Sequence, residues 1–422
     1  MQKKPNLSTQ FLGLKFKSPI LVSSSESTAN ESLVGKLISR NIGGIVTKTY
    51  TSSPENRIRV RPYQFPLNRF GAAYARGGCL FSLAAPHVEA AAAVNQHLAQ
   101  MASICRQSSV VLIASFFENP LDLDLWIHRA KEFEAIGADM LELNFSSPSA
   151  AKVFSHSFDS ASQIIAQVKK NTTIPIGLKL SPTLEPLEIF VKTCVKAGLD
   201  FITAHNAPSG MVIDIDKEIP FGAPSLGGYV MGRAFLPYSL GRVVRIRQAA
   251  DIPVIGVGGI YEARDALQYL LCGCPLVGIG SAIYFEGLEV LNTIEKGISD
   301  WMQTKNYGLI SEFQGNAFLH IKSPDHVKSK ELYPYVLPPE CPWVPQIDDE
   351  LCTRCGVCVK SCIYDVLKKD DKNKKIVIDE KKCWSCGFCV GVCPGSAIKL
   401  VDQSDHKQMI WNNHGFAKSF QE

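Results

Sequence analysis

Eight of the fourteen cysteines crowd into one short part of the chain. They are Cys352, Cys355, Cys358, Cys362, Cys383, Cys386, Cys389 and Cys393, within 42 residues, whereas the other six are scattered. The first residues, MQKKPNLSTQFLGLKF, contain no apolar run of the length that a secretory signal needs, so a framework of disulfide bonds is not expected. Thiols at this density are typical of metal ligation.

The spacing of these cysteines favours iron–sulfur clusters over zinc. Each group of four reads CxxCxxCxxxC, the pattern of bacterial ferredoxins with two clusters, in which the fourth cysteine of each run ligates the other cluster. We therefore expect one [4Fe-4S] cluster on Cys352, Cys355, Cys358 and Cys393, and a second on Cys383, Cys386, Cys389 and Cys362. Zinc, the alternative, is usually held by two spaced pairs. Pro394 follows the second run but Ile363 follows the first, a small departure because this position supplies no ligand.

Two lysines and two asparagines stand at the ends of apolar stretches earlier in the chain. GIVTK ends at Lys48, MLELN ends at Asn144, IGLKL contains Lys179, and FITAH is followed by Asn206. A lysine that ends a buried strand needs an anionic or electron-rich partner, because an unpaired ammonium is costly away from water. The four side chains would form a ring of donors that can hold a planar heterocycle. The alternative for a single such lysine is a surface residue whose ammonium reaches solvent.

Glycine-rich turns follow the last two apolar stretches. GVGGI at 256–260 supplies Gly258 and Gly259, and GIGSA at 278–282 supplies Gly280 and Ser281. Glycines let backbone N–H groups approach an anion, and a phosphate site after the seventh and eighth strands recurs in parallel barrels. Glycines also end strands for steric reasons, so either turn alone is weak evidence. The two together predict a phosphorylated cofactor.

The elements that position these residues alternate along the first three hundred positions. Strands are expected at 19–24, 44–48, 110–115, 140–144, 176–180, 201–205, 254–257 and 276–279, followed by helices at about 29–40, 87–106, 122–137, 159–171, 185–198, 238–250, 262–273 and 286–304. Eight such units without a Rossmann phosphate fingerprint predict an α/β fold, a (β/α)8 TIM barrel whose reactive groups lie at the carboxyl ends of the strands. An open parallel sheet with one strand wrongly assigned is the alternative.

Composition divides the chain into four parts. Residues 1–304 form the expected barrel, 305–346 a linker rich in proline and aromatic residues, 347–400 an α+β ferredoxin-like domain with two clusters, and 401–422 a polar tail. Residues 49–86 are a long insertion after the second strand, and insertions of this length usually carry function or cover a site.

Composition and charge exclude several classes of partner. Hydrophobic residues make up 46% of the 422 positions and charged residues 20%, as in a well-buried globular protein. A net charge of +4 gives no sign of a nucleic acid or an anionic membrane as partner. No segment approaches the ~18 apolar residues of a membrane span. We expect a cytoplasmic protein.

The motifs taken together resemble those of a known family. SPILVSS, VTKT, LELNFSSP, IGLKL, ITAHNA, VIGVGGI and IGSAIYFEG follow the order of the dihydroorotate dehydrogenase family of FMN-binding barrels. With its cysteine domain, the chain is similar over residues 10–400 to the FMN and iron–sulfur subunit of NAD-dependent dihydropyrimidine dehydrogenases. The resemblance implies FMN as the cofactor of the barrel.

The resemblance also implies roles for single residues. Lys48 and Lys179 would contact the flavin, with Asn144 and Asn206 near its ring and near the bound pyrimidine. The other cofactor-binding residues would be Ser23, Gly232, Gly258, Gly259, Gly280 and Ser281, the last five around the ribityl phosphate.

Ser147, in the stretch LELNFSSPSA, matches the proton-transfer residue of the family. The resemblance implies that Ser147 acts with Asn144 and Asn206 in catalysis. It would remove a proton from one carbon of a dihydropyrimidine while a hydride leaves the next carbon for the flavin N5, or serve the reverse reaction. A serine hydroxyl is a weak acid and needs a neighbouring base or a relaying water. His156 could assist, or it is a solvated loop histidine.

Two positions depart from family members that bind orotate. Ser149 stands where they usually have asparagine, and Ala207 where they have a hydroxyl residue. The stretch GGCLFSLAAP at 77–86 offers no clear counterpart of their loop asparagine. Each loss removes a polar contact to a buried ring, and such contacts discriminate strongly between substrates. The flavin site is therefore better preserved than the pyrimidine site.

The expected function is an oxidoreductase that uses FMN and two [4Fe-4S] clusters and acts on the CH–CH group of a dihydropyrimidine-like small molecule. No GxGxxG motif joins a strand to a helix, so an FAD/NAD(P) partner subunit or a ferredoxin is expected to exchange the electrons, within a homo- or hetero-oligomer. Two alternatives stay open: an electron-transfer subunit without pyrimidine chemistry of its own, and the same reaction on a different substrate.

Overall fold

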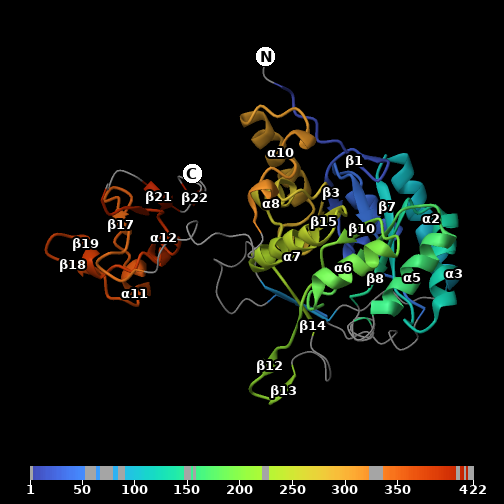
Figure 1. Ribbon diagram of the computed structural model, residues 1–422, viewed down its shortest axis with the longest axis horizontal. Helices are drawn as coiled ribbons and strands as arrows, with labels where there is room; N and C mark the ends of the chain where they lie inside the picture. The colour runs from blue at the N-terminus through green and yellow to red at the C-terminus, as the bar shows by residue number, and fades with distance from the viewer. Residues whose placement is uncertain are drawn as a thin grey trace. The chain divides into compact units, whose positions relative to one another are not determined.

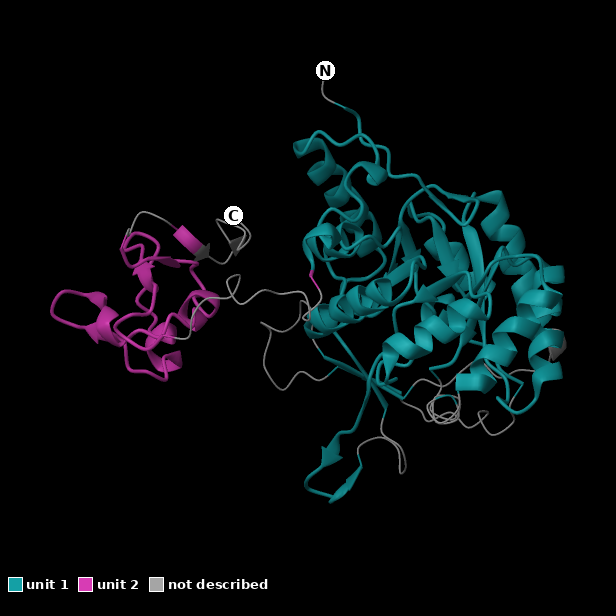
Figure 2. Ribbon diagram, in the orientation of Figure 1, with its two compact units in different colours: residues 1–321 teal, residues 322–422 magenta. Residues whose placement is uncertain are grey.

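A computed structural model describes the architecture of the chain (Figure 1). The described residues are 3–52, 63–66, 79–83, 91–146, 154, 158–220, 228–322, 336–404, 409–412 and 415–416. The chain forms two compact units, Met1–Ile321 and Lys322–Glu422 (Figure 2). Over the described residues, each helix is too short or too polar to cross a membrane.

The first unit contains a closed barrel of eight parallel strands. In order around the barrel they are β3 (Ile20–Val22), β4 (Gly44–Val46), β7 (Val111–Phe116), β8 (Met140–Asn144), β9 (Ile176–Lys179), β10 (Phe201–Thr203), β15 (Val254–Val257) and β16 (Leu276–Ile279). β16 pairs with β3 and closes the barrel. The predicted (β/α)8 barrel is confirmed, and β7 alone extends, by one residue, beyond its expected range.

Helices after the strands form the outer layer (Figure 1). They are α1 (Glu31–Leu37), α2 (Ala91–Gln107), α3 (Leu123–Ile136), α5 (Phe158–Asn171), α6 (Leu187–Lys196), α7 (Leu236–Ala249), α8 (Ala263–Leu271), α9 (Ala282–Glu286) and α10 (Glu289–Thr304). Local signals set their ends: Asn30 and Asp122 accept backbone N–H bonds at the starts of α1 and α3, and Gly137 (φ 113°) ends α3 in the left-handed region.

Side chains of each strand alternate between the helices and the barrel interior. On β8, Leu141 and Leu143 pack in the outer core, whereas Met140 joins the inner cluster. That cluster contains Phe11, Phe16, Leu21, Val46, Val111, Ile113, Met140, Phe201, Ile255 and Leu276. The hairpin β1 (Thr9–Phe11) and β2 (Leu14–Phe16) contributes its two phenylalanines to this amino end of the barrel. By the same alternation, Glu142 and Asn144 share the inward face with Met140.

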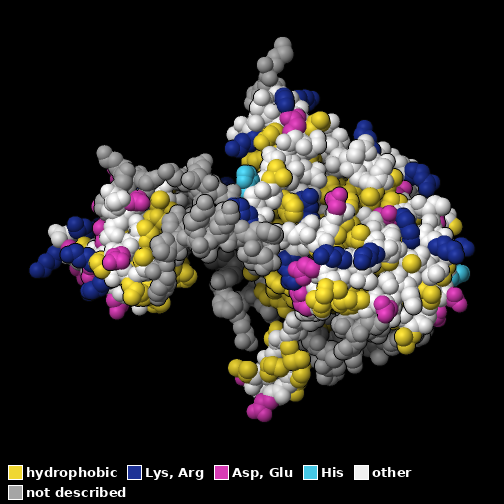
Figure 3. Space-filling view, in the orientation of Figure 1, with side chains coloured by type: hydrophobic (Ala, Val, Ile, Leu, Met, Phe, Trp, Pro, Cys, Tyr) yellow, Lys and Arg dark blue, Asp and Glu magenta, His cyan; other side chains and the backbone are white. Residues whose placement is uncertain are grey.

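A second sheet is built from the long insertion and from the segment after β10. Its antiparallel order is β11 (Ser209–Gly210), β14 (Gly228–Met231), β6 (Leu80–Ser82) and β5 (Gln64–Pro66). The hairpin β12 (Ile213–Asp214) and β13 (Ile219–Pro220) projects from the barrel, and hydrophobic side chains gather on it (Figure 3). Short 3₁₀ turns complete the unit: η1 (Glu26–Thr28), η4 (Arg233–Phe235), η5 (Ile310–Glu312) and η6 (Phe318–His320).

The second unit is an α+β domain. Its larger sheet contains β17 (Trp343–Ile347), β20 (Ile398–Asp402), β21 (Met409–Asn412) and β22 (Gly415–Phe416), and the hairpin β18 (Leu367–Asp370) and β19 (Lys375–Ile378) stands apart. The helices are α11 (Val357–Ser361) and α12 (Phe388–Gly391), with the turn η9 (Glu380–Lys382) before the second run of cysteines.

The boundary between the two units, at residues 321 and 322, lies inside the stretch 305–346 that was expected to be a linker. Residues 305–321 belong to the barrel unit, where the rings of Tyr307 and Phe313 pack on Trp301 of α10. Residues 343–347 form β17, and 401–402 complete β20. The packing of these rings holds residues 305–321 on the barrel unit, and most of the proline-rich stretch that suggested a linker lies outside the described residues.

The two cysteine runs share one backbone conformation. Arg354 (φ 55°) and Ser385 (φ 54°) occupy equivalent positions within the runs, as do Gly356 (φ 79°) and Gly387 (φ 74°), and all four lie in the left-handed region. A short helix follows each glycine. The domain is therefore a structural duplication, which is what the repeated sequence pattern predicts.

Gly177 provides a test of the packing inside the barrel. A Cβ on Gly177 would lie 2.1 Å from the Phe201 ring, which occupies the space next to β9. We predict that Gly177→Ala lowers the free energy of unfolding by about 1–3 kcal/mol, because the ring has to shift. Urea unfolding of the wild type, Gly177→Ala and Gly177→Ala/Phe201→Leu measures it. The smaller leucine should restore part of the loss, and equal stability of Gly177→Ala and the wild type would contradict this packing.

Candidate functional site

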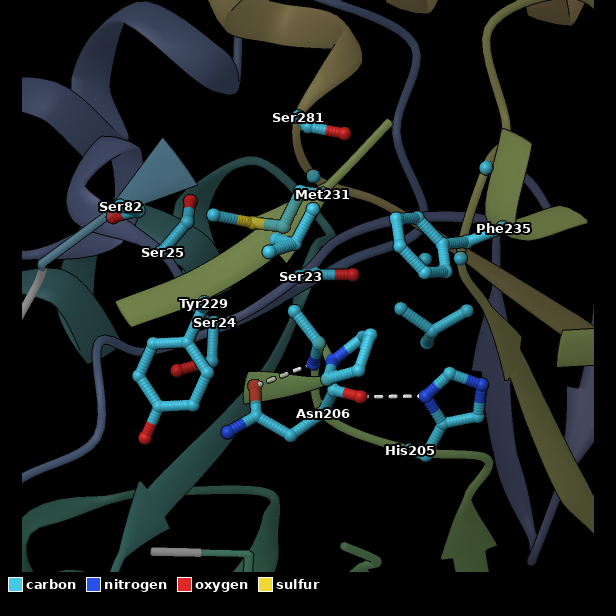
Figure 4. A pocket seen from close by; sticks show the side chains of 18 of the residues that line it. Ser23, Ser24, Ser25, Ser82, His205, Asn206, Tyr229, Met231, Phe235 and Ser281 are labelled. Carbon is cyan, nitrogen blue, oxygen red and sulfur yellow. Dashed lines mark hydrogen bonds between the residues drawn. The ribbon is translucent and has the colours of Figure 1, made fainter. Parts of the chain in front are cut away.

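A pocket lies at the carboxyl ends of the barrel strands (Figure 4). Its lining includes each of the ten cofactor-binding residues expected from the sequence: Ser23, Lys48, Asn144, Lys179, Asn206, Gly232, Gly258, Gly259, Gly280 and Ser281. The barrel brings them together because parallel strands all end at one mouth. Their individual roles stay predictions.

Three loop residues of the expected site, Ser147, Ser149 and His156, lie outside the described residues. Ala207, the other departure from the family pattern, lines the pocket. Its backbone N–H donates to the Asn206 Oδ1 at 3.0 Å, which holds the Asn206 amide against its own backbone.

Lys179 ends β9 with its side chain inside the barrel. The residue is 7% exposed, and burial lowers the pKa of its ammonium, an effect that the charge of Glu142 opposes. The neighbouring strand places Asn144 directly beside Lys179. A buried ammonium close to an amide suits an electron-rich ligand, because such a ligand supplies the negative potential that water cannot.

Lys48 is held by an ion pair within the same pocket. Its Nζ lies 2.9 Å from Glu26 Oε1, and both side chains are largely buried. Glu26 belongs to η1, the turn after β3, and the Lys48 backbone N–H donates to the Thr28 carbonyl of that turn at 3.0 Å. The turn therefore fixes both the backbone and the ammonium of Lys48.

The glycines after β15 leave no room for side chains. Gly258 (φ 120°) and Gly259 (φ 70°) both lie in the left-handed region. A Cβ on Gly259 would stand 2.5 Å from the Leu236 backbone nitrogen at the start of α7. Around Gly280, by contrast, the nearest atom to an added Cβ is the Ser23 Cβ at 3.9 Å. The backbone here is tight toward α7 and open toward the pocket.

His205, which follows β10, is a buried neutral imidazole in the wall of the pocket. The pKa of His205 is lowered to about 4, mainly by burial, since the residue is only 4% exposed. Its Nδ1 lies 2.5 Å from the Asn206 carbonyl oxygen (Figure 4). A carbonyl only accepts, so Nδ1 carries the proton and Nε2 presents a lone pair. Nε2 has no hydrogen-bond partner among the described residues.

Several pocket residues were not expected from the sequence. They are Ser25, Glu26, Gln64, Ser82, Tyr229, Phe235 and Tyr284, among others. Gln64 and Ser82 come from the insertion, whose length did predict that it covers a site. Tyr229 on β14 carried no such signal, since only tertiary pairing with β6 brings it to the pocket.

The second unit has two further pockets, each lined by four cysteines. One is lined by Cys352, Cys355, Cys358 and Cys393, and the other by Cys362, Cys383, Cys386 and Cys389. The fourth cysteine of each run thus lies with the first three of the other run, the crossed arrangement expected for two clusters.

Comparison with known proteins identifies both units. The family model for dihydroorotate dehydrogenase matches residues 6–302, and the model for a 4Fe-4S dicluster domain matches residues 351–397. The chain belongs to the dihydroorotate dehydrogenase family. It is a CH–CH oxidoreductase of this family with a ferredoxin-type dicluster domain at its carboxyl end, and its cofactors are FMN and two [4Fe-4S] clusters.

Relatives in this family match the barrel over nearly their whole length. The "Dihydroorotate dehydrogenase B (NAD(+)), catalytic subunit" of Geotalea daltonii is 28% identical over 316 residues, 74% of this chain and 98% of the relative. Proteins of the same name from Pyrococcus abyssi (27%; 74% of this chain, 99% of the relative) and Methanocaldococcus jannaschii (26%; 72% and 95%) are similar. About a quarter of this chain has no counterpart in these alignments.

The pocket of this dihydroorotate dehydrogenase-family barrel fits FMN. Lys48 and Lys179 supply positive charge, and the open backbone at Gly280 leaves room for the cofactor. The buried Ser23 hydroxyl has no hydrogen-bond partner among the described residues, as expected for a group that binds a ligand. Lys48, Lys179 and the glycine turns are the residues that would hold FMN.

His205 predicts a loss of stability in acid. The folded state keeps this imidazole neutral to about pH 4, whereas the unfolded chain protonates it near 6.5. Stability is therefore lost as pH falls through this interval, by about 2 kcal/mol from His205 alone between pH 8 and pH 5. Urea unfolding at both pH values should show a smaller loss for His205→Gln than for the wild type. His128→Gln, on the exposed face of α3, controls for the removal of a histidine, and equal losses in all three proteins would contradict the burial argument.

The crossed cysteine sets predict which double variants keep one cluster. Cys355→Ala and Cys393→Ala should each lose half of the bound iron, and the double variant should lose no more, because both residues serve one cluster. Cys355→Ala combined with Cys389→Ala should lose all of it. Iron and acid-labile sulfide are measured after anaerobic reconstitution. If Cys355→Ala/Cys393→Ala loses all its iron, the sets are not crossed.

Proposed function

We propose that the barrel oxidises or reduces the CH–CH group of a dihydropyrimidine-like substrate, either dihydroorotate or an uncharged dihydropyrimidine. The observation that carries the proposal is the convergence of Asn144 and Asn206 with Lys48 and Lys179 in one pocket. Two amides provide the donors and acceptors that an imide ring needs, beside the residues that fit the flavin. The names of the relatives, which specify dihydroorotate, support the reaction type.

The residues of the chain would bind, orient and protonate the substrate. When bound, FMN supplies hydride exchange with the substrate and single-electron exchange with the clusters. Asn144 and Asn206 would orient the ring, and the walls of the pocket from β14 and η4 would keep water away from it. Ser147, at the matching family position, would hold or remove the proton at the neighbouring carbon.

Electrons would leave or enter through the dicluster domain. We propose an FAD/NAD(P) subunit or a ferredoxin as the partner, in keeping with the words "NAD(+)" and "catalytic subunit" in the names of the relatives. Since the described part of the chain shows no nucleotide-binding βαβ unit besides the barrel, direct reaction with a nicotinamide is not part of the proposal.

A second candidate function is an electron-transfer subunit without pyrimidine chemistry of its own. Ala207 favours it, because this position in the pocket lacks the hydroxyl expected for orotate binding. The amides of Asn144 and Asn206 weigh against it, since a site that only relays electrons has no need of paired amides in its wall.

Anaerobic reduction of the flavin distinguishes the two candidates. The reconstituted protein is mixed with dihydroorotate, dihydrouracil and dihydrothymine in turn, and the flavin absorbance is followed. We predict that at least one of them bleaches the flavin, and that Ser147→Ala slows this at least ~100-fold, the usual scale of acid–base catalysis, without loss of FMN. Bleaching by dithionite but by none of the three would refute the proposed substrate class. Unchanged rates in Ser147→Ala would remove only the role of Ser147.

A further inference from the structure

Glu142 is a buried carboxylate inside the barrel that no part of the proposed chemistry uses. It lies on the inward face of β8, two residues before Asn144, and is 1% exposed. Its Oε1 accepts from the Ser115 hydroxyl at 2.9 Å and its Oε2 from the Thr203 hydroxyl at 2.6 Å. A polar group buried so deeply has to be satisfied by such bonds, and both oxygens are.

We infer that Glu142 is a positioning residue, whose carboxylate sets the direction of a buried hydrogen-bond chain that fixes Asn144 and Ser24 in the wall of the pocket. Four oxygen atoms form the chain. Ser115 Oγ lies 2.9 Å from Thr49 Oγ1, and Thr49 Oγ1 lies 3.1 Å from Ser24 Oγ. The Asn144 amide nitrogen joins the chain at Thr49 Oγ1, at 2.9 Å.

The direction of the chain follows from counting hydrogens. A carboxylate only accepts, so the single hydroxyl hydrogen of Ser115 is given to Glu142. In the next bond Thr49 therefore donates to Ser115, and Thr49 has no second hydrogen. Consequently Ser24 donates to Thr49, and the Asn144 group that faces Thr49 has to be the NH₂.

The other end of the Asn144 amide is fixed independently. Its Oδ1 accepts from the Ser146 backbone N–H at 3.1 Å and from the Ser146 hydroxyl at 2.5 Å. The amide thus has one orientation, with one N–H used by Thr49 and the second without a partner among the described residues. Ser24, whose hydrogen is used, can only accept. Since both residues line the pocket, its wall offers a donor from Asn144 and an acceptor from Ser24.

This pattern matches a ring edge on which a carbonyl and an N–H are neighbours, as in a pyrimidine or in the pyrimidine part of a flavin. The assignment of a substrate pyrimidine rests on the proposed function, whereas the orientation of the amide does not. Glu142 also opposes the fall in the pKa of Lys179, so one carboxylate serves both the buried ammonium and the hydrogen-bond chain.

Two variants, each of which removes one of the two hydroxyl groups that donate to Glu142, make a matched test. Ser115→Ala breaks the chain between Glu142 and Thr49, whereas Thr203→Val removes the other hydroxyl, which does not stand between Glu142 and Asn144. Glu142→Gln is less decisive, because a glutamine oxygen could still accept from Ser115. The FMN-loaded, full-length wild type and both variants are compared for melting temperature, flavin absorption spectrum and the dissociation constant of orotate and of uracil, measured by perturbation of the flavin spectrum.

Both variants should lose similar thermal stability, since each leaves one Glu142 oxygen without its hydroxyl. We expect Ser115→Ala to weaken pyrimidine binding at least ~10-fold and to shift the flavin spectrum, because Thr49 can then turn its hydrogen toward Asn144 or Ser24. Thr203→Val should stay within about twofold of the wild type. Equal effects of both variants on binding and spectrum, or none from Ser115→Ala, would overturn the inference. If the wild type binds neither pyrimidine, the proposed function fails. The role of Glu142 is then decided by comparing the flavin spectra of Ser115→Ala and Thr203→Val with that of the wild type.

Discussion

An ammonium group buried inside a barrel has to be compensated, and the site of this protein depends on how that is done. Lys179 ends a strand with its side chain in the interior, where burial lowers the pKa of the amine and Glu142 raises it. Burying an ion costs several kcal/mol even after the protein relaxes, so the carboxylate cannot be exchanged freely for an apolar residue. Its presence requires hydroxyl donors, which Ser115 provides from β7 and Thr203 from β10. Lys179, Glu142, Ser115 and Thr203 thus form a polar layer inside the barrel.

This polar layer lies between an apolar cluster and the pocket inside the barrel. Below it, toward the amino ends of the strands, Met140, Ile113 and Phe201 belong to an apolar cluster that the β1–β2 hairpin completes. Above it lies the pocket, with Lys48 paired to Glu26 and the glycine turns after β15 and β16. The strands thus carry an apolar cluster at one end and the pocket at the other, and the carboxyl end is where active sites lie in this fold.

The sequence predicted the barrel and the residues that end its strands because both depend on local periodicity. Alternation along MLELN places Glu142 and Asn144 on one face, and the carboxyl end of every parallel strand leads to the same mouth. The sequence did not predict the hydrogen-bond chain from Ser24 to Glu142, because contacts between strands depend on their register. No single strand encodes this register, which places Asn144 beside Lys179, for example. The same limit applies to Tyr229 and Gln64, which reach the pocket through a sheet of distant segments. In the second unit the cysteine spacing sufficed, since the repeat carries its own backbone geometry.

We propose that the barrel mouth, organised around the buried Lys179, is the FMN site of this dihydroorotate dehydrogenase-family protein. Titration of FMN onto the flavin-free protein, followed by flavin fluorescence, tests it most directly, with the wild type compared with Lys179→Met. We predict that the variant keeps its far-ultraviolet circular dichroism but binds FMN at least ~10-fold more weakly, since it loses a charge-assisted contact. A folded Lys179→Met variant with the FMN affinity of the wild type would contradict it.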